Sequence, residues 1–422
     1  MSGEADQEFL QWDYERNYLY AGDQPVCFHC HHYNLFIQET IDEALGAAIG
    51  DQLRREASAD AWRPVLEALF SGQALHGSYE KLSAAFELFA STGQGKLVLE
   101  DASLQNAAIS SEALHYGTAW RMIHGTQAAL HVTDGLAAGF ISAAFELAYE
   151  LAPGSIEVTQ TACIAMGDAR DQFELIQHEQ PRELNPTISR ARMEANTGQM
   201  VDSLEEETVS EITRAFCGML AQITPDDRGL VEGFGILVTL TPTAYYNTLC
   251  LKVMEYLEAE HPTLLQVSEQ MLYEAGRLCG FNTFGGVLKS PEWEAIIGRE
   301  RTADPEETLL HTCAIARSFG FGKWSVHEYF DEDLLVLRAP ATYEDPFVCE
   351  LRGESKRPVC YLFTGAGESM ARLAEDVDWS NAPMFGLDYY DETVKRSDTS
   401  WRAKQTQCRA RGDAFAEVTV ER

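Results

Sequence analysis

The sequence predicts an α+β fold built as two tandem, related domains, because a ten-residue pattern occurs twice. Gln-Thr-x-Cys-x-Ala-x-Gly-Asp-Ala has Cys163 at its centre in one copy and Cys408 in the other. Two shorter patterns, Ser-x-Gly-x-Gly-Lys and Tyr-Asn, recur in the same order, at residues 91–96 and 318–323 and at residues 33–34 and 246–247. The spacings between patterns differ by the length of a surface loop, which chains tolerate. A duplicated domain explains all three patterns.

The first predicted domain spans residues 18–180, with helices packed on a small antiparallel sheet that ends in a β-hairpin. Apolar residues near a period of 3.6 predict its helices, and turn residues bound its short strand-like runs. The expected order is strand 25–29, helix 33–53, helix 79–89, strand 96–100, helices 112–124 and 136–151, and a hairpin of 155–162 with 171–177. The glycines of Ser-x-Gly-x-Gly-Lys follow a helix, so we expect a C-terminal cap with positive φ rather than a phosphate loop.

Residues 181–230 are predicted to be a linker with one helix, 203–223, whose start matches a capping box of Ser203 and Glu206. The second predicted domain spans residues 231–422 and repeats the order of the first. Its expected elements are helix 245–260, helix 307–319, strand 323–329, extended runs 334–338 and 348–352, helix 367–375, and a hairpin of 402–408 with 415–420. Each half is therefore expected to be α+β.

The composition limits the classes of partner. A formal net charge of −34 repels nucleic-acid phosphates, so we expect no nucleic acid as a partner. No run of eighteen apolar residues occurs, and residues 1–11 are polar, so we expect a cytoplasmic protein without a membrane segment. The ten cysteines are expected to be reduced thiols. An internal duplication often replaces a homodimer, so the protein is expected to be a monomeric pseudo-dimer or a homodimer.

The segment 27–32 is the richest in groups that bind metals, with two cysteines and three histidines in six positions. If the strand continues through it, His29 and His31 point to one face and could converge on one ion, with His32 or Cys30 as further ligands. The matching stretch of the second half, residues 240–245, has none of these groups. The asymmetry favours a catalytic or metal-binding role for the three histidines. The alternative is packing or hydrogen bonding in the core.

Glu39 lies within helical reach of His32 and would complete a set of two histidines and one carboxylate, a combination suited to non-haem iron. The alternative for Glu39 is a place on a solvated helix face. The pattern Cys27-x-x-Cys30-His31 also matches the sequence motif of a c-type haem attachment site. Covalent haem requires an export compartment, which the polar N-terminal residues do not indicate. Iron or zinc is therefore the expected cofactor, and haem is the less expected one.

A second candidate set lies around the repeated cysteines. In the first half His131, Cys163 and Asp171 could meet, since Asp171 follows Cys163 by eight residues and His131 falls near the position of Cys360 in the second half. The second half would offer only Cys360 and Cys408. Zinc sites with two thiolates normally need two more ligands.

The Cys-x-Ala-x-Gly-Asp hairpin follows a helix with paired glycines, Gly135 and Gly139 in the first half and Gly365 and Gly367 in the second, and this arrangement resembles the 4-vinyl reductase domain family in two tandem copies. The resemblance implies α+β domains that bind small molecules. Some members bind zinc through an upstream cysteine, a glutamate and two hairpin cysteines. By position the upstream cysteine is matched by Cys360 and His131, and the second hairpin cysteine by Ala416 and Asp171, so the zinc site of the family is altered here.

These observations together predict a protein that binds a small, mostly apolar or aromatic organic compound. The leading expectation for its activity is a metal-dependent enzyme, an oxidoreductase with non-haem iron or zinc at His29, His31 and His32. The alternatives are a non-catalytic binding or sensing protein, in which the histidines tune affinity, and a haem-binding protein.

Overall fold

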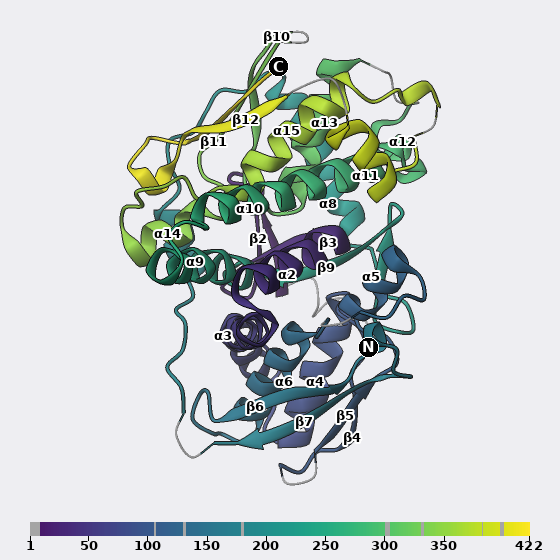
Figure 1. Ribbon diagram of the computed structural model, residues 1–422, viewed down its shortest axis with the longest axis vertical. Helices are drawn as coiled ribbons and strands as arrows, with labels where there is room; N and C mark the ends of the chain where they lie inside the picture. The colour runs from purple at the N-terminus through teal and green to yellow at the C-terminus, as the bar shows by residue number, and fades with distance from the viewer. Residues whose placement is uncertain are drawn as a thin grey trace.

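The computed structural model describes residues 9–104, 107–129, 132–178, 181–299, 304–330, 333–381, 383–396 and 401–422. The fold is α+β, with three antiparallel sheets and helices packed against them (Figure 1). In the view of Figure 1, two four-stranded sheets lie at opposite ends of the molecule and a five-stranded sheet lies between them. Among the described residues, no helix combines the length and the apolar character needed to cross a membrane.

The two end sheets have the same strand order, each counted from the start of its own half. In the first half the order is β4 (Val98–Asp101), β5 (Ala108–Ser111), β7 (Asp171–Gln177) and β6 (Ile156–Ala162). In the second it is β10 (Ser325–Phe330), β11 (Leu334–Ala339), β13 (Ala416–Glu421) and β12 (Arg402–Gln407). Each sheet ends in the hairpin that carries the ten-residue pattern, so both predicted hairpins are confirmed.

The halves meet in the central sheet, whose order is β1 (Leu10–Asp13), β2 (Tyr18–Ala21), β3 (Gln24–Cys30), β9 (Ile236–Pro242) and β8 (Val231–Gly233). β3 pairs with β9 antiparallel, with Phe28 opposite Leu240. The helices that follow, α2 (His31–Leu45) and α9 (Thr243–Glu260), each begin three residues beyond that pair. Tyr33 and Tyr245 are thus the third residues of their helices, and the predicted match of Tyr33 with Tyr246 is wrong by one position.

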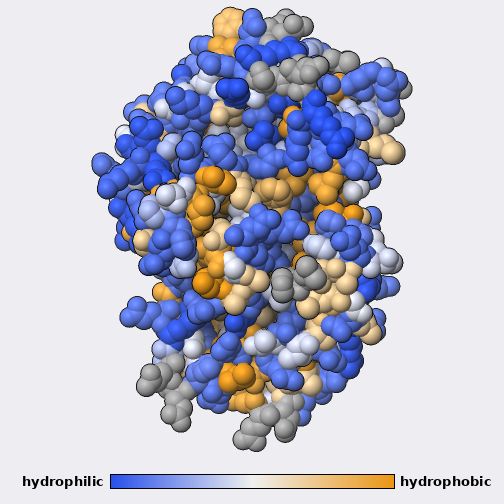
Figure 2. Space-filling model, viewed as in Figure 1, coloured by the Kyte–Doolittle hydropathy of each residue, from blue (hydrophilic) through white to orange (hydrophobic). Residues whose placement is uncertain are grey.

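The remaining helices share one continuous hydrophobic core that runs through both halves. They are α3 (Ala47–Gly72), α4 (Ser78–Ser91), α5 (His115–His124), α6 (Gly135–Ala148), α7 (Arg190–Ala195), α8 (Glu206–Leu220), α10 (Leu265–Cys279), α11 (Gly285–Lys289), α12 (Pro291–Ile297), α13 (Pro305–Ser318), α14 (Asp345–Arg352), α15 (Tyr361–Glu375) and α16 (Leu387–Tyr390). Figure 2 shows apolar side chains gathered at mid-height of the drawn face, over the region of α2 and α10. The predicted boundaries at residues 180 and 231 stay predictions.

The paired glycines allow two long helices to approach closely in each half. Gly139 and Gly365 are the fifth residues of α6 and α15, and a methyl group on either would collide with a backbone carbonyl, that of Arg55 on α3 or of Tyr273 on α10. The Ser-x-Gly-x-Gly-Lys glycines also act as predicted, because α4 and α13 end at its serines and Gly93 and Gly320 follow with φ of +79° and +83°.

Several predicted elements differ from the structure. The helix expected over 33–53 breaks at Gly46 into α2 and α3, and the extended run expected at 348–352 belongs to α14. The capping box at Ser203 is absent, because α8 begins at Glu206 after a left-handed Glu205 with φ of +44°. Glu206 instead pairs with the buried Arg317 at 2.9 Å, which ties α8 to α13. Tertiary ion pairing overrides the local capping signal here.

Candidate functional site

The repeated pattern is explained by the turn of each hairpin. The Cys163 N–H donates to Asp168 Oδ2 at 2.8 Å, and the Cys408 N–H donates to Asp413 Oδ2 at the same distance. A short 3₁₀ turn follows each cysteine and ends at a glycine with positive φ, Gly167 at +105° and Gly412 at +87°. Cysteine, aspartate and glycine are thus the parts of one turn that buries the cysteine.

The glutamine of the pattern brings a third group to that cysteine. The Asp134 N–H donates to Gln160 Oε1 at 2.6 Å, and the Cys360 N–H donates to Gln405 Oε1 at 3.2 Å. Asp134 and Cys360 are the N-cap residues of α6 and α15. Asp134, not His131, therefore holds the position of Cys360, which corrects the prediction. His131 itself lies outside the described residues.

In the second half this arrangement forms a buried set of three metal-ligating groups. The ligand atoms of Asp345, Cys360 and Cys408 all lie within 4.8 Å of one another. Burial raises the pKa of Asp345 to about 6, and its Oδ2 has no hydrogen-bond partner among the described residues. The Cys360–Cys408 hydrogen bond lowers the pKa of Cys408. Two sulfurs and one carboxylate oxygen suit zinc, which takes Cys and Asp ligands in tetrahedral sites.

In the first half the groups around Cys163 form no such set, although Asp171, like Asp345, has one carboxylate oxygen that accepts a backbone N–H and one, Oδ2, without a partner among the described residues. Asp171 Oδ1 accepts from the Ile164 N–H at 3.0 Å and from Gln160 Nε2 at 2.8 Å, and Asp134 Oδ1 caps α6 by accepting from the Ala137 N–H. Burial raises the pKa of Cys163 to about 12. Among the described residues, Cys163 and Asp171 belong to no group of three metal-ligating atoms. The structure therefore brings the two together but gives them a structural role.

The three histidines of segment 27–32 do not converge. The strand ends at Cys30, because Cys30 Sγ accepts the Tyr33 N–H and caps α2, so His31 and His32 lie in the first helical turn. His29 Nε2 lies 3.2 Å from the Tyr343 hydroxyl, whereas His31 Nδ1 accepts the Leu237 N–H at 3.1 Å. The described part of the chain places none of these histidines, nor Cys30 or Glu39, in a group of three ligand atoms. The geometry that predicted a shared ion required a continuous strand, which is absent.

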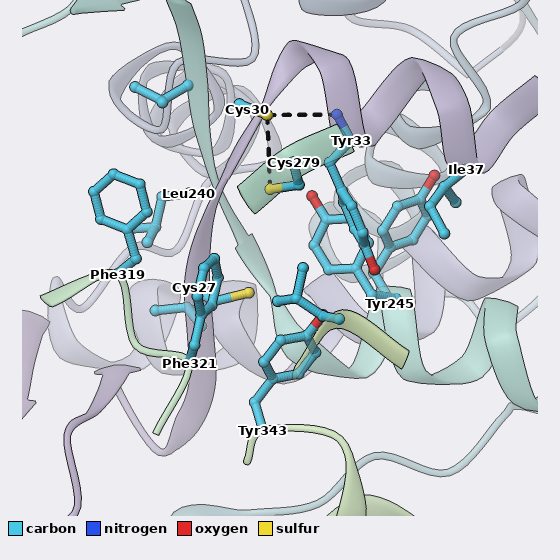
Figure 3. Packing of buried hydrophobic residues seen from close by; sticks show 14 of the residues in the cluster. Cys27, Cys30, Tyr33, Ile37, Leu240, Tyr245, Cys279, Phe319, Phe321 and Tyr343 are labelled. Atoms are coloured by element: carbon cyan, nitrogen blue, oxygen red, sulfur yellow. Dashed lines mark hydrogen bonds between the residues drawn. The ribbon is translucent and has the colours of Figure 1, made fainter. Parts of the chain in front are cut away.

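His29 and Cys30 are both fully buried, and Figure 3 shows Cys30 beside Tyr33 and Cys279 in the core. The His29 ring stacks on Tyr33 with centroids 4.0 Å apart, and burial lowers its pKa well below the usual value. Cys30 Sγ lies 3.8 Å from Cys279 Sγ at the end of α10. Cys27 and Cys30, the thiols of the haem-like spelling, are both fully buried.

A cavity of about 480 Å³ lies beside the third histidine, where the β8–β9 turn faces α11 and α12. Its apolar wall includes Phe234, Met384 and Phe385, and its polar lining includes His32, Asn282 and Lys289. His32 and Asn282 are 7% and 0% exposed, yet His32 Nδ1 and Asn282 Oδ1 have no hydrogen-bond partner among the described residues. Buried polar atoms without partners are uncommon, so a ligand group is the natural partner for these two.

Glycines and a π-helix shape this cavity. Phe385 packs directly on Gly285, and the Phe234 carbonyl approaches Gly286 so closely that an added methyl group would lie 2.8 Å from it. Phe234 itself has φ of +58° in the tight β8–β9 turn. Asn282 lies in the π-helical turn Gly280–Phe284, a distortion often found at functional sites.

His32 is electrically neutral at ordinary pH. Burial lowers the pKa of its imidazole well below the usual value, and the adjacent His31, with ring centroids 4.0 Å apart, lowers it further. The buried polar lining of the cavity thus includes a neutral imidazole, a neutral carboxamide and the Ser290 hydroxyl, while the opposite charges of Lys289 and Glu292 are exposed at the rim. Such a lining suits an uncharged polar group on an otherwise apolar molecule.

Sequence reasoning found His32 but missed Asn282, Asp345 and Asp134. Nothing in the local sequence marks Asn282, because the cavity joins a turn, a π-helix and a helix start from distant parts of the chain. Asp134 could have been found as the residue before the helix glycine in the first half, at the position where Cys360 precedes α15.

Comparisons with known proteins add little to this picture. No family model and no curated protein matches the chain. Among solved structures, the chain is similar to the phenol-responsive sensory domain of the transcription activator PoxR, bound to phenol, at 15% identity and a TM-score of 0.32. That similarity covers 40% of this chain and 84% of the sensory domain. A similarity this weak supports no inference about function.

Proposed function

We propose that the protein binds a small, mostly apolar organic molecule in the cavity beside His32 and that this binding, rather than metal chemistry at the histidines, is its function. The observation that carries the proposal is the pair of buried polar atoms without partners, His32 Nδ1 and Asn282 Oδ1, in a cavity with aromatic walls. The ligand class that fits is an aromatic compound with one O–H or N–H group. This group would donate a hydrogen bond to Asn282 Oδ1. The resemblance to 4-vinyl reductase domains, proposed from the hairpins, points to the same broad function.

The test uses indole as the probe, because it is aromatic and carries a single N–H. Indole should raise the thermal midpoint of the protein and titrate to one site by calorimetry, since a ligand that binds only the native state stabilises it. Asn282→Leu should remove the acceptor and weaken binding about tenfold or more, because a buried donor left unpaired costs about 1–3 kcal/mol. Asn196→Leu, which changes an amide at the end of α7, is the matched control. Equal affinity in both variants would overturn the proposal.

We further propose that Asp345, Cys360 and Cys408 hold a zinc ion that stabilises the fold, with a water molecule or another group as its fourth ligand. The supporting observation is the buried three-ligand set with an Asp345 oxygen that has no partner among the described residues. Zinc would join α14, the start of α15 and the closing hairpin, and would supply no chemistry to the cavity beside His32. Elemental analysis of protein purified without added metal should find about one zinc per chain, and a metal-free preparation that keeps its full thermal stability would contradict this proposal.

A further inference from the structure

A second hollow in the first half has an unusual lining. It is a groove of about 540 Å³ between α2, α5 and the segment after α5. Its lining includes Gln38, Glu39, Asp42 and Glu43 from α2 and Trp120 from α5. The three carboxylates follow one another along the same face of α2, as expected for positions three and four residues apart. The groove is therefore acidic and has an aromatic ring at one side.

The acidic groups are only partly neutralised within the protein. Asp42 is paired with the buried Arg54 at 2.6 Å. Glu39 and Glu43 have no ion-pair partner in the described ranges of the chain. Burial raises the pKa of Glu39, and the nearby charges of Glu43 and Asp42 raise it further. A cation bound between these two glutamates would relieve that repulsion.

Gln38 provides independent support for a ligand. Its side chain lines the groove and is 2% exposed, and neither its carboxamide nitrogen nor its oxygen has a hydrogen-bond partner among the described residues. Leaving both ends of a buried amide without partners is costly. A ligand with an N–H group could donate to Gln38 Oε1, and Gln38 directly precedes Glu39 in the chain.

Trp120 is fixed in place beside the acidic groups. Its indole N–H donates to the Gln127 carbonyl at 2.7 Å, and its ring lies 4.0 Å from that of His124. The indole face attracts organic cations, which bind better to Trp than to other aromatic rings. Leu35 and Ala129 supply apolar surface in the same groove.

The same elements of the second half form a groove of mixed charge. That groove, of about 240 Å³, lies between α9, α14 and the segment after α14. The eighth, ninth and twelfth residues of α2 are Gln38, Glu39 and Asp42, whereas the same positions of α9 are Cys250, Leu251 and Met254. The second groove has charged side chains of both signs, with Arg352, Lys356 and Arg357 beside four glutamates, and Glu255 is paired with Arg352. The shared position of Glu43 and Glu255 is acidic in both halves, whereas Glu39 and Asp42 are acidic in the first half alone.

We propose that the groove between α2 and α5 binds a small organic diammonium compound, with its ammonium groups at Glu39 and Glu43, an N–H on Gln38 Oε1 and its hydrocarbon chain against Trp120 and Leu35. The groove is separate from the cavity beside His32, so this proposal does not depend on the proposed function. The ligand binds by charge and hydrogen bonding, and no covalent step is involved.

The test is calorimetry of the full chain with 1,4-diaminobutane, with 1,4-butanediol as the neutral analogue of equal length and with Ca²⁺ as the metal probe. Saturable binding of the diamine, weakened by added salt, is expected, with no binding of the diol. Glu39→Gln with Glu43→Gln should weaken diamine binding at least tenfold, and Gln38→Leu should weaken it severalfold. Glu255→Gln with Glu258→Gln, which removes two acids from the second groove, is the matched control and should leave binding unchanged.

Each other outcome overturns the proposal. If the Glu39 and Glu43 double variant binds the diamine as tightly as the wild-type protein does, the diamine binds elsewhere on the acidic surface. Equal binding of the diol shows a merely apolar groove, and tight Ca²⁺ binding without diamine binding shows a metal site. Near-ultraviolet circular dichroism of each variant checks the native packing, and because both glutamates are replaced at a partly open groove, the double variant is expected to fold.

Discussion

The hairpin of the first half and the hairpin of the second have the same backbone but different chemistry. Both bury a cysteine through an aspartate and a positive-φ glycine, and both use a glutamine to hold the start of the next helix. The second half then places the ligand atoms of Asp345 and Cys360 within 4.8 Å of Cys408 Sγ, whereas among the described residues no such set of three lies around Cys163. The repeated residues thus form the turn, and residues outside the repeat, Asp345 and Cys360, complete the three-ligand set of the second half.

The largest expected effect is the difference between replacing Cys360, a proposed zinc ligand, and replacing Cys163 of the first half. Cys360→Ser should lower bound zinc from about one per chain to near zero and should destabilise the protein by several kcal/mol, because structural zinc contributes directly to folding. Cys163→Ser should leave the zinc content unchanged. Elemental analysis with thermal unfolding measures both. Equal loss of metal in the two variants would mean that the halves do not differ as described.

The paired glycines should respond alike in both halves. Gly139→Ala and Gly365→Ala each place a methyl group against a backbone carbonyl, so each should lower stability by about 3 kcal/mol through overpacking. Gly218→Ala is the control, because nothing lies within 4 Å of the added methyl group and alanine favours a helix by up to about 1 kcal/mol. Thermal unfolding of the three variants gives the comparison, and a mild effect at one glycine alone breaks the equivalence of the helix pairs.

The buried acid of the first half should make stability depend on pH. Burial raises the pKa of Asp134 from 3.8 to about 7, so the folded protein holds this proton more tightly than the unfolded chain. Its contribution is fully present below about pH 4 and is lost as the pH rises to about 7. Asp134→Asn should flatten the pH dependence in that window and should be the more stable form at about pH 8, where the wild-type protein must bury a charged carboxylate. An unchanged profile in denaturant unfolding would exclude this role of Asp134.

The smallest expected effect tests the turns themselves. Asp168→Ala and Asp413→Ala each remove the acceptor of a cysteine N–H at 2.8 Å, and each should cost about 1 kcal/mol. The two costs should agree within the error of chemical denaturation if the turns are equivalent. A clearly larger cost at Asp413 would show that its turn is also coupled to the proposed zinc ion.

The fold could be predicted from the sequence where local chemistry decides the structure. The turns around Cys163 and Cys408 and the helix ends before Gly93 and Gly320 depend on residues within a few positions, so their patterns predicted them correctly. The run 348–352 was predicted as extended, but it is the C-terminal part of α14, which has Pro346 in its first turn. Its helical state depends on packing in the second half.

The candidate site was harder to predict from the sequence, because it also depends on packing between distant segments. Segment 27–32 was expected to be one strand, but the change from strand to helix at His31 depends on a thiol that caps the helix and on the pairing of β3 with β9. Of the three histidines only His32 lines the cavity, and Asn282, which lines it as well, comes from a π-helical turn that no sequence pattern predicts. Glu39, predicted as an iron ligand, lines the acidic groove instead.

The β3–β9 ladder has a consequence for how the molecule holds together. In a dimer of separate chains, a symmetric pair of strands of this kind would form by association of two molecules and would dissociate on dilution. Within one chain its strands are tethered, so closing it is a first-order event with an effective concentration set by the connecting segment. The cohesion of the two halves should therefore be independent of protein concentration, and mutations could accumulate in one copy without being imposed on the other. That freedom would allow the cluster of Asp345, Cys360 and Cys408 in one half and the acidic groove along α2 in the other.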